Sequence, residues 1–191
     1  MSEFILKLSN ISKSFGGVKV LENVSFDVGK GSRHALIGPN GAGKTTLFNV
    51  ISGIHDPEKG TVYFKGKDLR GVPSRKRIHR GLSRSFQNIR LMPHLSVLEN
   101  VMLGQHSRIN FVDMFKPLDF LSKSSGKGEA IETLKSFGID LHKGQTVSSL
   151  PYGIRKKIEV VRALMAKPSL LLLDEPAAGL NTAETKKLRD F

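Results

Sequence analysis

The sequence predicts an α/β fold, and two changes of pattern along the chain indicate it. The first third contains short β-rich runs separated by glycine-containing turns, whereas helical periodicity dominates from about residue 74 onward. A continuous apolar run then returns at residues 170–173, as expected for a strand buried on both faces of a sheet. A chain of 191 residues can form one large domain, or a core with a smaller subdomain.

Each element is predicted from its own local signals. The expected strands are residues 4–11, 18–21, 24–28, 33–37, 61–64 and 170–173. The expected helices are residues 44–52, 96–103, 129–137, 153–166 and 181–191. The helix at residue 96 begins with Ser96 and has Glu99 three residues later, which is the pattern of a capping box. Residues 107–127 show no firm period, so no element is predicted there.

Composition narrows the classes of protein but does not choose among them. The chain has no cysteine, which excludes disulfides and thiolate metal sites, and no run of 18 apolar residues. We therefore expect neither a membrane span nor secretion. The net charge of +13 is compatible with nucleic acid, an anionic membrane surface or a nucleotide as partner. The densest basic segment, residues 75–84, is expected to be a helix with a solvated basic face. A nucleic-acid groove is the less favoured alternative, because Phe86 is the one aromatic side chain nearby.

A glycine-rich motif, GPNGAGKTT, predicts a nucleoside triphosphate site. The predicted phosphate-binding residues are consecutive: Gly38, Pro39, Asn40, Gly41, Ala42, Gly43, Lys44, Thr45 and Thr46. Glycines allow backbone N–H groups to turn inward around phosphate oxygens, and the helix that follows adds its positive dipole end. Lys44 is expected to reach the β and γ phosphates, and the Thr45 hydroxyl to bind Mg²⁺. An ordinary glycine-rich turn is the alternative, and the predicted strand before and helix after the motif argue against it.

Two adjacent carboxylates follow the apolar run at residues 170–173. Asp174 is the candidate ligand for Mg²⁺, because it would lie at the carboxyl end of a buried strand, where such sheets bind ligands. Glu175 is the candidate general base that accepts a proton from an attacking water. The alternative is a buried strand that ends in a surface acidic pair, and the phosphate loop makes this alternative the weaker one.

Further motifs make the whole chain resemble the ATP-binding cassette (ABC) ATPases. They are Gln87 within SRSFQN, the segment Leu150, Pro151, Tyr152 and Gly153 before a helix, residues 177–181, and Phe15. The resemblance implies a phosphate-loop NTPase fold of ABC type, with a mixed sheet core, an N-terminal antiparallel β-subdomain and an inserted helical subdomain. It implies a core at residues 1–86, a helical subdomain at 87–162, and a last segment at 163–191 with the acidic strand.

The resemblance also assigns roles to these residues. Gln87 would contact Mg²⁺ and the attacking water, and Phe15 would stack on adenine. Residues 150–153 would cap the γ-phosphate bound by a second subunit. A polar loop residue and a core phenylalanine are the alternatives for Gln87 and Phe15. The implied cofactors are ATP and Mg²⁺, and the implied partners are a second ATPase subunit and membrane permease subunits. The chain would then be cytoplasmic and peripheral to the inner face of the cell membrane.

Within the family, the motifs are most similar to the ATPase subunits of branched-chain amino-acid importers, and importers of amides and urea share them. Departures from the family pattern are Pro151 and Ile154 in place of serine and glutamine, and Asn181 in place of aspartate. The family's later strand with its switch histidine is also absent, since sixteen residues follow Glu175 and all six histidines precede it. We therefore expect a C-terminally truncated chain. A nucleotide-binding fragment without turnover and a nucleic-acid-associated ABC ATPase remain alternatives, although we do not expect nucleic acid as a partner.

Overall fold

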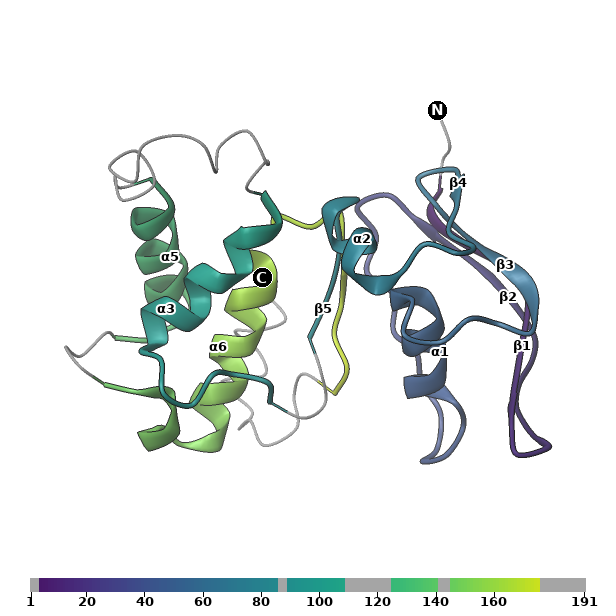
Figure 1. Cartoon of the computed structure of the whole chain (residues 1–191), viewed down its shortest axis with the longest axis horizontal. Coiled ribbons are helices and arrows are strands. Elements are labelled where there is room, and N and C mark those ends of the chain that lie inside the picture. Colours follow the sequence, from purple (N-terminus) through teal and green to yellow (C-terminus); the bar gives the residue numbers. More distant parts are fainter. Residues whose placement is uncertain (1–3, 86–88, 109–124, 141–144, 176–191) are drawn as a thin grey trace. The chain divides into compact units, whose positions relative to one another are not determined.

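The chain divides into two compact units, residues 1–82 and 83–191. The computed structural model describes residues 4–85, 89–108, 125–140 and 145–175 (Figure 1). The predicted boundaries at residues 86 and 162 stay predictions. The predicted helix at residues 181–191, Asn181, Phe86 and Gln87 lie outside the described residues.

The first unit is built on an antiparallel sheet, which confirms the predicted β-subdomain. Its strands are β1 (Phe4–Phe15), β2 (Val18–Gly29), β3 (Lys59–Phe64) and β4 (Lys67–Asp68), in the order β2-β1-β3-β4. β1 continues to Phe15 instead of ending at residue 11, and the two expected strands at 18–21 and 24–28 form one strand. Asn10 and Asn23 have φ values of 53° and 49°, at irregularities that allow this long hairpin to bend without breaking.

Helix α1 (Lys44–Ser52) lies beside this sheet, with the bounds predicted from the sequence (Figure 1). Leu47, Val50 and Ile51 are buried on its inner face. The helix ends at Gly53, whose φ of 76° is a left-handed conformation that glycine adopts without a steric penalty. The apolar stripe and the glycine stop therefore account for the whole element.

The strand predicted at residues 33–37 is wrong. The structure assigns no strand there, and Leu36 and Ile37 are 40% and 90% exposed. An apolar run forms a buried strand only when neighbouring strands pair with it on both sides. No described residue forms such a ladder with residues 33–37, so they lead into the glycine-rich loop without regular secondary structure.

The expectation of a solvated basic face at residues 75–84 is wrong at Arg77, which α2 (Ser74–His79) buries to 2% exposure. Its guanidinium donates to the carbonyl oxygens of Val50 and Ile51 at 2.9 and 2.7 Å, and to those of Leu69 and Val72 at 3.0 and 2.8 Å. The first two carbonyls belong to the last turn of α1, where a helix leaves acceptors unsatisfied and carries partial negative charge. Arg77 therefore caps the helix that follows the glycine-rich loop.

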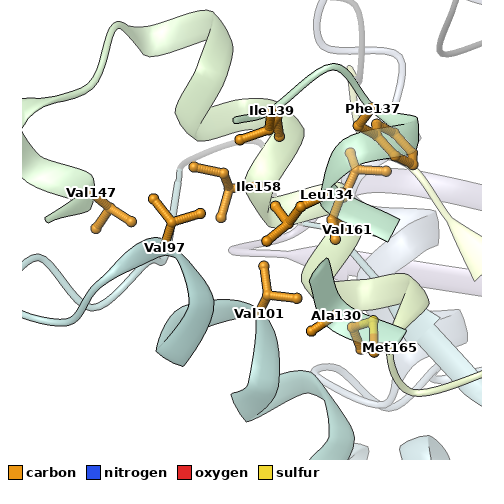
Figure 2. Close-up of a cluster of buried hydrophobic side chains, with 11 residues drawn as sticks. Val97, Val101, Ala130, Leu134, Phe137, Ile139, Val147, Ile158, Val161 and Met165 are labelled. Carbon is orange, nitrogen blue, oxygen red and sulfur yellow. The ribbon is translucent and has the colours of Figure 1, made fainter. Parts of the chain in front are cut away.

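The second unit is mainly helical around one apolar core. Its elements are β5 (Leu82–Arg84), α3 (Val97–Met102), the 3₁₀ turns η1 (Leu103–Arg108) and η3 (Val147–Ser149), α5 (Ser125–Ser136), α6 (Tyr152–Leu164) and β6 (Leu170–Leu172). Apolar side chains of α3, α5 and α6 point toward one another and exclude water (Figure 2). This packing fixes the three helices against each other.

Local signals predicted most elements of this unit. The capping box is present, since the Ser96 hydroxyl accepts from the Glu99 N–H and the Glu99 carboxylate accepts from the Ser96 N–H. α5 begins four residues earlier than expected, at Ser125, and β5 pairs with β6. No helix among the described residues is long and apolar enough to cross a membrane.

Candidate nucleotide-binding site

The glycine-rich loop curls around the ammonium group of Lys44. The Lys44 Nζ donates to the carbonyl oxygens of Gly38 and Pro39 at 2.6 and 2.7 Å, and the Ala42 N–H donates to the Pro39 carbonyl at 3.2 Å. α1 starts directly at Lys44, and no side chain caps the N–H groups of its first turn. Residues 39–42 are exposed. The loop thus presents a cation, free helix donors and open access, which are the requirements for binding phosphate.

Glycine is required at the position where the loop joins α1. Gly43 has a φ of 84°, and a Cβ atom built on it would lie 2.8 Å from the Val20 carbonyl oxygen and 3.0 Å from the Leu21 Cδ2. Gly41 has a similar φ of 83°, but a Cβ there would meet nothing within 4 Å. Gly43 therefore serves both the turn and the close approach of the loop to β2, whereas Gly41 serves the turn alone.

Phe15 stands at the end of β1 with 43% of its surface exposed, so it is not the buried core phenylalanine of the alternative interpretation. The edge of its ring meets the His55 ring, with centroids 5.3 Å apart and an interplanar angle of 69°. The Lys13 Nζ lies 5.4 Å from the ring centroid, in a cation–π arrangement. Partial packing orients the ring and leaves apolar surface on which a base could stack.

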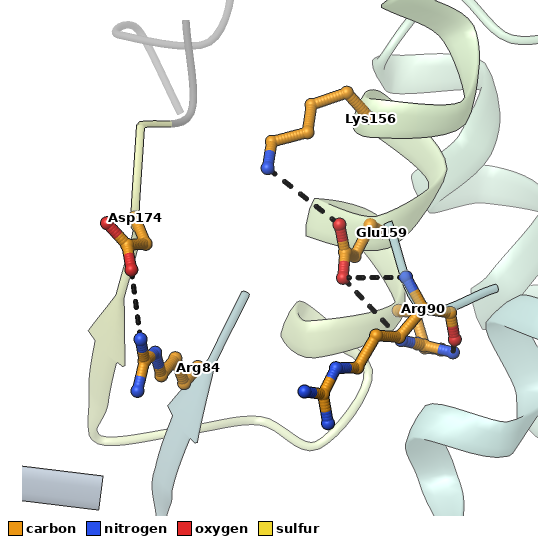
Figure 3. A network of polar contacts seen from close by, with 6 residues as sticks. Arg84, Arg90, Lys156, Glu159 and Asp174 are labelled. Atoms are coloured by element: carbon orange, nitrogen blue, oxygen red, sulfur yellow. Dashed lines mark hydrogen bonds and ion pairs between the residues drawn. The ribbon is translucent and has the colours of Figure 1, made fainter. Parts of the chain in front are cut away.

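The carboxylate of Asp174 is buried in the second unit and forms an ion pair (Figure 3). The Arg84 Nη2 donates to the Asp174 Oδ2 at 2.9 Å, and the two side chains are 5% and 6% exposed. β5 and β6 bring these residues together across 90 positions of sequence, with the Ser85 N–H donating to the Leu172 carbonyl at 2.9 Å. The expectation of a solvated basic face at residues 75–84 is therefore wrong at Arg84 too, because a basic residue between two serines carries no signal of burial.

Glu175 differs from its neighbour in exposure and in backbone. It is exposed and has a φ of 47°, a left-handed value that is uncommon for residues other than glycine. Non-glycine residues held in this region cost free energy and cluster at functional sites. The turn after β6 therefore directs two adjacent carboxylates to different environments, one buried and one exposed.

Residues 150–153 form the start of α6. Pro151 is the N-cap residue, Tyr152 is 45% exposed, and Leu150 packs partly buried against the helical core. The cap receives no side-chain hydrogen bond, so the N–H groups of the first turn are not satisfied by a capping residue. Pro151 cannot supply the serine hydroxyl of the family pattern, but the helix end can still attract an anion.

The middle of α6 contains a buried charged cluster that the sequence analysis also missed. Glu159 is 1% exposed, and its carboxylate lies 3.9 Å from the Lys156 Nζ and 3.8 Å from the Arg162 Nη2 (Figure 3). The Glu159 Oε1 also accepts from the Arg90 N–H at 3.4 Å. Burial lowers the pKa of the Arg162 guanidinium, and the charge of Glu159 opposes this effect. The cluster connects α6 to the segment that follows Gln87.

The residues present fit a magnesium ion by their chemistry. Thr45, in the first unit, is exposed and carries a hydroxyl, and Asp174, in the second unit, carries a carboxylate; each is the kind of hard oxygen ligand that Mg²⁺ prefers. The described residues hold no cluster of three or more histidine and acidic side chains, so a closed cage made by the protein is not found among them. One or two protein ligands with phosphate oxygens and water are the usual magnesium arrangement at such loops.

A phosphate loop, its helix and an acidic strand end define the class of nucleotide-binding cassettes. The family profile described as ABC transporter matches residues 21–178, which is most of the chain. The chain belongs to the ABC transporter ATPase family, whose members hydrolyse ATP to drive transport.

The chain is similar in sequence to two curated relatives, and in sequence and structure to one solved structure. The chain is 36% identical over 195 residues to the "High-affinity branched-chain amino acid transport ATP-binding protein LivG" of Salmonella typhimurium, covering 100% of this chain and 76% of that protein. It is 37% identical over 188 residues to the "Ribose import ATP-binding protein RbsA" of Caldanaerobacter subterraneus, covering 97% of this chain and 36% of that protein. The ATP-binding cassette MJ1267 superposes with a TM-score of 0.82 at 32% identity, covering 99% of this chain and 76% of that one.

Proposed function

We propose that this ABC ATPase is the ATP-binding subunit of an importer for branched-chain amino acids. The observation that carries nucleotide binding is the loop at residues 38–46, which closes around Lys44 at the start of α1. The Lys44 ammonium can turn from carbonyl oxygens to the β and γ phosphates, because phosphate is the more strongly attracting acceptor. The exposed ring of Phe15 in the same unit supports its assignment to the adenine.

The proposed metal ligands are Thr45, Asp174 and Gln87. When bound, Mg²⁺ would supply positive charge that offsets the negative charge developing during phosphoryl transfer. The protein's part is to present hydroxyl, carboxylate and amide oxygens to the ion. Support comes from the exposed Thr45 and from Asp174, which lies two residues after the end of β6.

We assign the role of general base to Glu175. Its exposed carboxylate can accept a proton from water, and its left-handed backbone separates it from the buried Asp174. The carboxylate then holds the proton while the water oxygen bonds to the γ-phosphorus and the bond to the leaving ADP oxygen breaks. Glu175→Gln keeps the size and hydrogen bonding of this side chain but cannot accept the proton.

Residues 150–153 are assigned to a second subunit's nucleotide. The uncapped first turn of α6 and the exposed Tyr152 support a contact outside this chain, with backbone N–H groups facing the γ-phosphate. ABC ATPases work as dimers with membrane permeases. We accordingly place this chain at the inner face of the cell membrane, bound to permease subunits.

Identity alone does not separate amino-acid import from ribose import, since the two relatives are 36% and 37% identical. Coverage favours branched-chain amino acids, because the match spans 76% of LivG but 36% of RbsA. The motifs around Gln87, Tyr152 and Glu175 also resemble those of branched-chain amino-acid importers.

Disruption of the gene in its own organism tests this function. We expect uptake of labelled leucine, isoleucine and valine to fall, uptake of ribose to be unchanged, and the wild-type gene but not Glu175→Gln to restore uptake. Loss of ribose uptake instead would show that ribose, and not a branched-chain amino acid, is the transported substrate. Full restoration of uptake by Glu175→Gln would show that Glu175 is not the general base.

A further inference from the structure

We infer that Arg84 is a positioning residue for magnesium binding, which acts by holding the Asp174 carboxylate. The inference rests on the proposed function, in which Asp174 is a ligand of Mg²⁺. Arg84 itself touches neither metal nor nucleotide in this account. It orients the side chain that does.

The geometry of the pair carries the inference. The Arg84 Nη2 to Asp174 Oδ2 distance is 2.9 Å, and both side chains are more than nine-tenths buried. Such a charge-assisted hydrogen bond in a site with little water is strong and directional. An aspartate at a strand end could otherwise choose among several rotamers, so this contact selects one.

The contact leaves the carboxylate able to bind a cation. A carboxylate has two oxygens, and Arg84 is seen on Oδ2, so Oδ1 of Asp174 remains as a ligand atom. The guanidinium also balances the buried negative charge, which would otherwise be costly before the metal arrives. Arg84 thus keeps Asp174 paired, buried and oriented in the protein without metal.

The strand pairing makes the arrangement rigid. The Ser85 N–H donates to the Leu172 carbonyl oxygen at 2.9 Å, one residue after Arg84 and two before Asp174. Both ends of the ion pair are therefore anchored on adjacent, hydrogen-bonded strands. Partners that orient metal ligands in this way contribute about 10–100-fold to metal affinity in other sites.

The test is the gain in nucleotide affinity that magnesium gives. Binding of the fluorescent analogue trinitrophenyl-ATP to the purified protein is measured with Mg²⁺ and with EDTA, and the ratio of the two Kd values is the readout. For Arg84→Met we expect the affinity in EDTA to stay within about twofold, whereas the magnesium-dependent gain falls about tenfold. Arg84→Lys keeps the charge with one donor and should recover part of the gain.

Two further variants separate positioning from a general loss of structure. Arg70→Met is the matched control, because Arg70 also pairs with an aspartate, Asp68, at 2.6 Å but is exposed. It should leave the gain unchanged. In an Asp174→Asn background, Arg84→Met should cause no further loss, since its effect passes through Asp174.

An unchanged or larger magnesium-dependent gain in Arg84→Met would overturn the inference. It would also be overturned if Arg84→Met lowered the gain in the Asp174→Asn background by as much as it does in the parent. A parent protein that binds no nucleotide in either condition would overturn the proposed function, and the inference with it.

Discussion

Arg162 is tied to the main chain at Arg90, since its Nη1 donates to the Arg90 carbonyl oxygen at 2.8 Å. The Arg90 N–H in turn donates to the Glu159 carboxylate at 3.4 Å, so one residue of the segment after Gln87 is held through both of its backbone groups. The helix that begins with residues 150–153 and the segment that follows Gln87 are thereby joined by polar contacts inside one unit. Motions of either segment should reach the other through Glu159.

Glu159→Gln should destabilise the second unit. The change removes a charge that is 1% exposed and leaves the buried Lys156 ammonium without this carboxylate, which costs about 3 kcal/mol in comparable buried pairs. Urea unfolding followed by circular dichroism measures the loss. Glu132→Gln on the exposed side of α5 is the control and should stay within about 0.5 kcal/mol of the parent. Equal stabilities of the two variants would show that the cluster contributes little.

Arg77→Met should destabilise the first unit by about 3 kcal/mol, because four carbonyl oxygens lose a charged donor at a site that is mostly buried. Arg75→Met removes an exposed arginine from the same helix and should have almost no effect. Thermal unfolding of both variants provides the comparison. Since Arg77 holds the far end of α1, its loss should also weaken nucleotide binding, whereas unchanged unfolding would refute the capping role.

Gly43→Ala should be more harmful than Gly41→Ala. Both substitutions place a side chain at a φ above 80°, but only at Gly43 would the Cβ come within 2.8 Å of the Val20 carbonyl. An alanine at position 41 should lower stability by about 1 kcal/mol, because its backbone is strained at this φ. An alanine at position 43 has the same strain and also clashes with the Val20 backbone. Denaturant midpoints of the two variants measure the difference. Equal midpoints would mean that the loop can move away from β2.

Glu99 gives the α3 capping box a dependence on pH. The Ser96 hydroxyl donates to the Glu99 carboxylate at 2.6 Å, and the Ser96 N–H donates to it at 2.8 Å. Both hydrogen bonds lower the pKa of Glu99, and the bond from the hydroxyl has the larger effect. Because the pKa of this carboxyl is lower in the folded state, its ionised form stabilises the protein at pH values above the unfolded-state pKa of about 4.3. This contribution is lost as the pH falls through the folded-state pKa. Glu99→Gln should therefore lose less stability than the parent between pH 7 and pH 3, as followed by denaturant titration. A parallel loss in both proteins would contradict this.

Local signals in the sequence were sufficient where a few neighbouring residues decide the structure. The bounds of α1 follow from its apolar stripe and Gly53, and the capping box follows from Ser96 and Glu99. The glycine-rich loop was likewise located by its motif. These features depend on contacts within one or two turns, so composition and spacing define them.

The sequence was insufficient where burial depends on distant partners. Arg77 is buried because carbonyls 26 and 27 positions earlier accept from it, and Arg84 because Asp174 lies 90 positions later. A basic residue in a polar segment normally indicates solvent, and nothing nearby opposed that expectation. The opposite error occurred at residues 33–37, where apolar residues predicted a buried strand although no described strand pairs with them.

Binding of Mg·ATP to the parent protein and to Lys44→Ala tests whether the loop at residues 38–46 is the nucleotide site. Calorimetric titration should show one nucleotide per chain for the parent, and a Kd about a hundredfold higher for Lys44→Ala, equivalent to about 2.7 kcal/mol lost with one charged phosphate contact. Lys19→Ala, which removes an exposed lysine of β2 paired with Glu22, should bind like the parent. Equal affinity of the parent and Lys44→Ala would contradict the assignment of the loop at residues 38–46 as the nucleotide site.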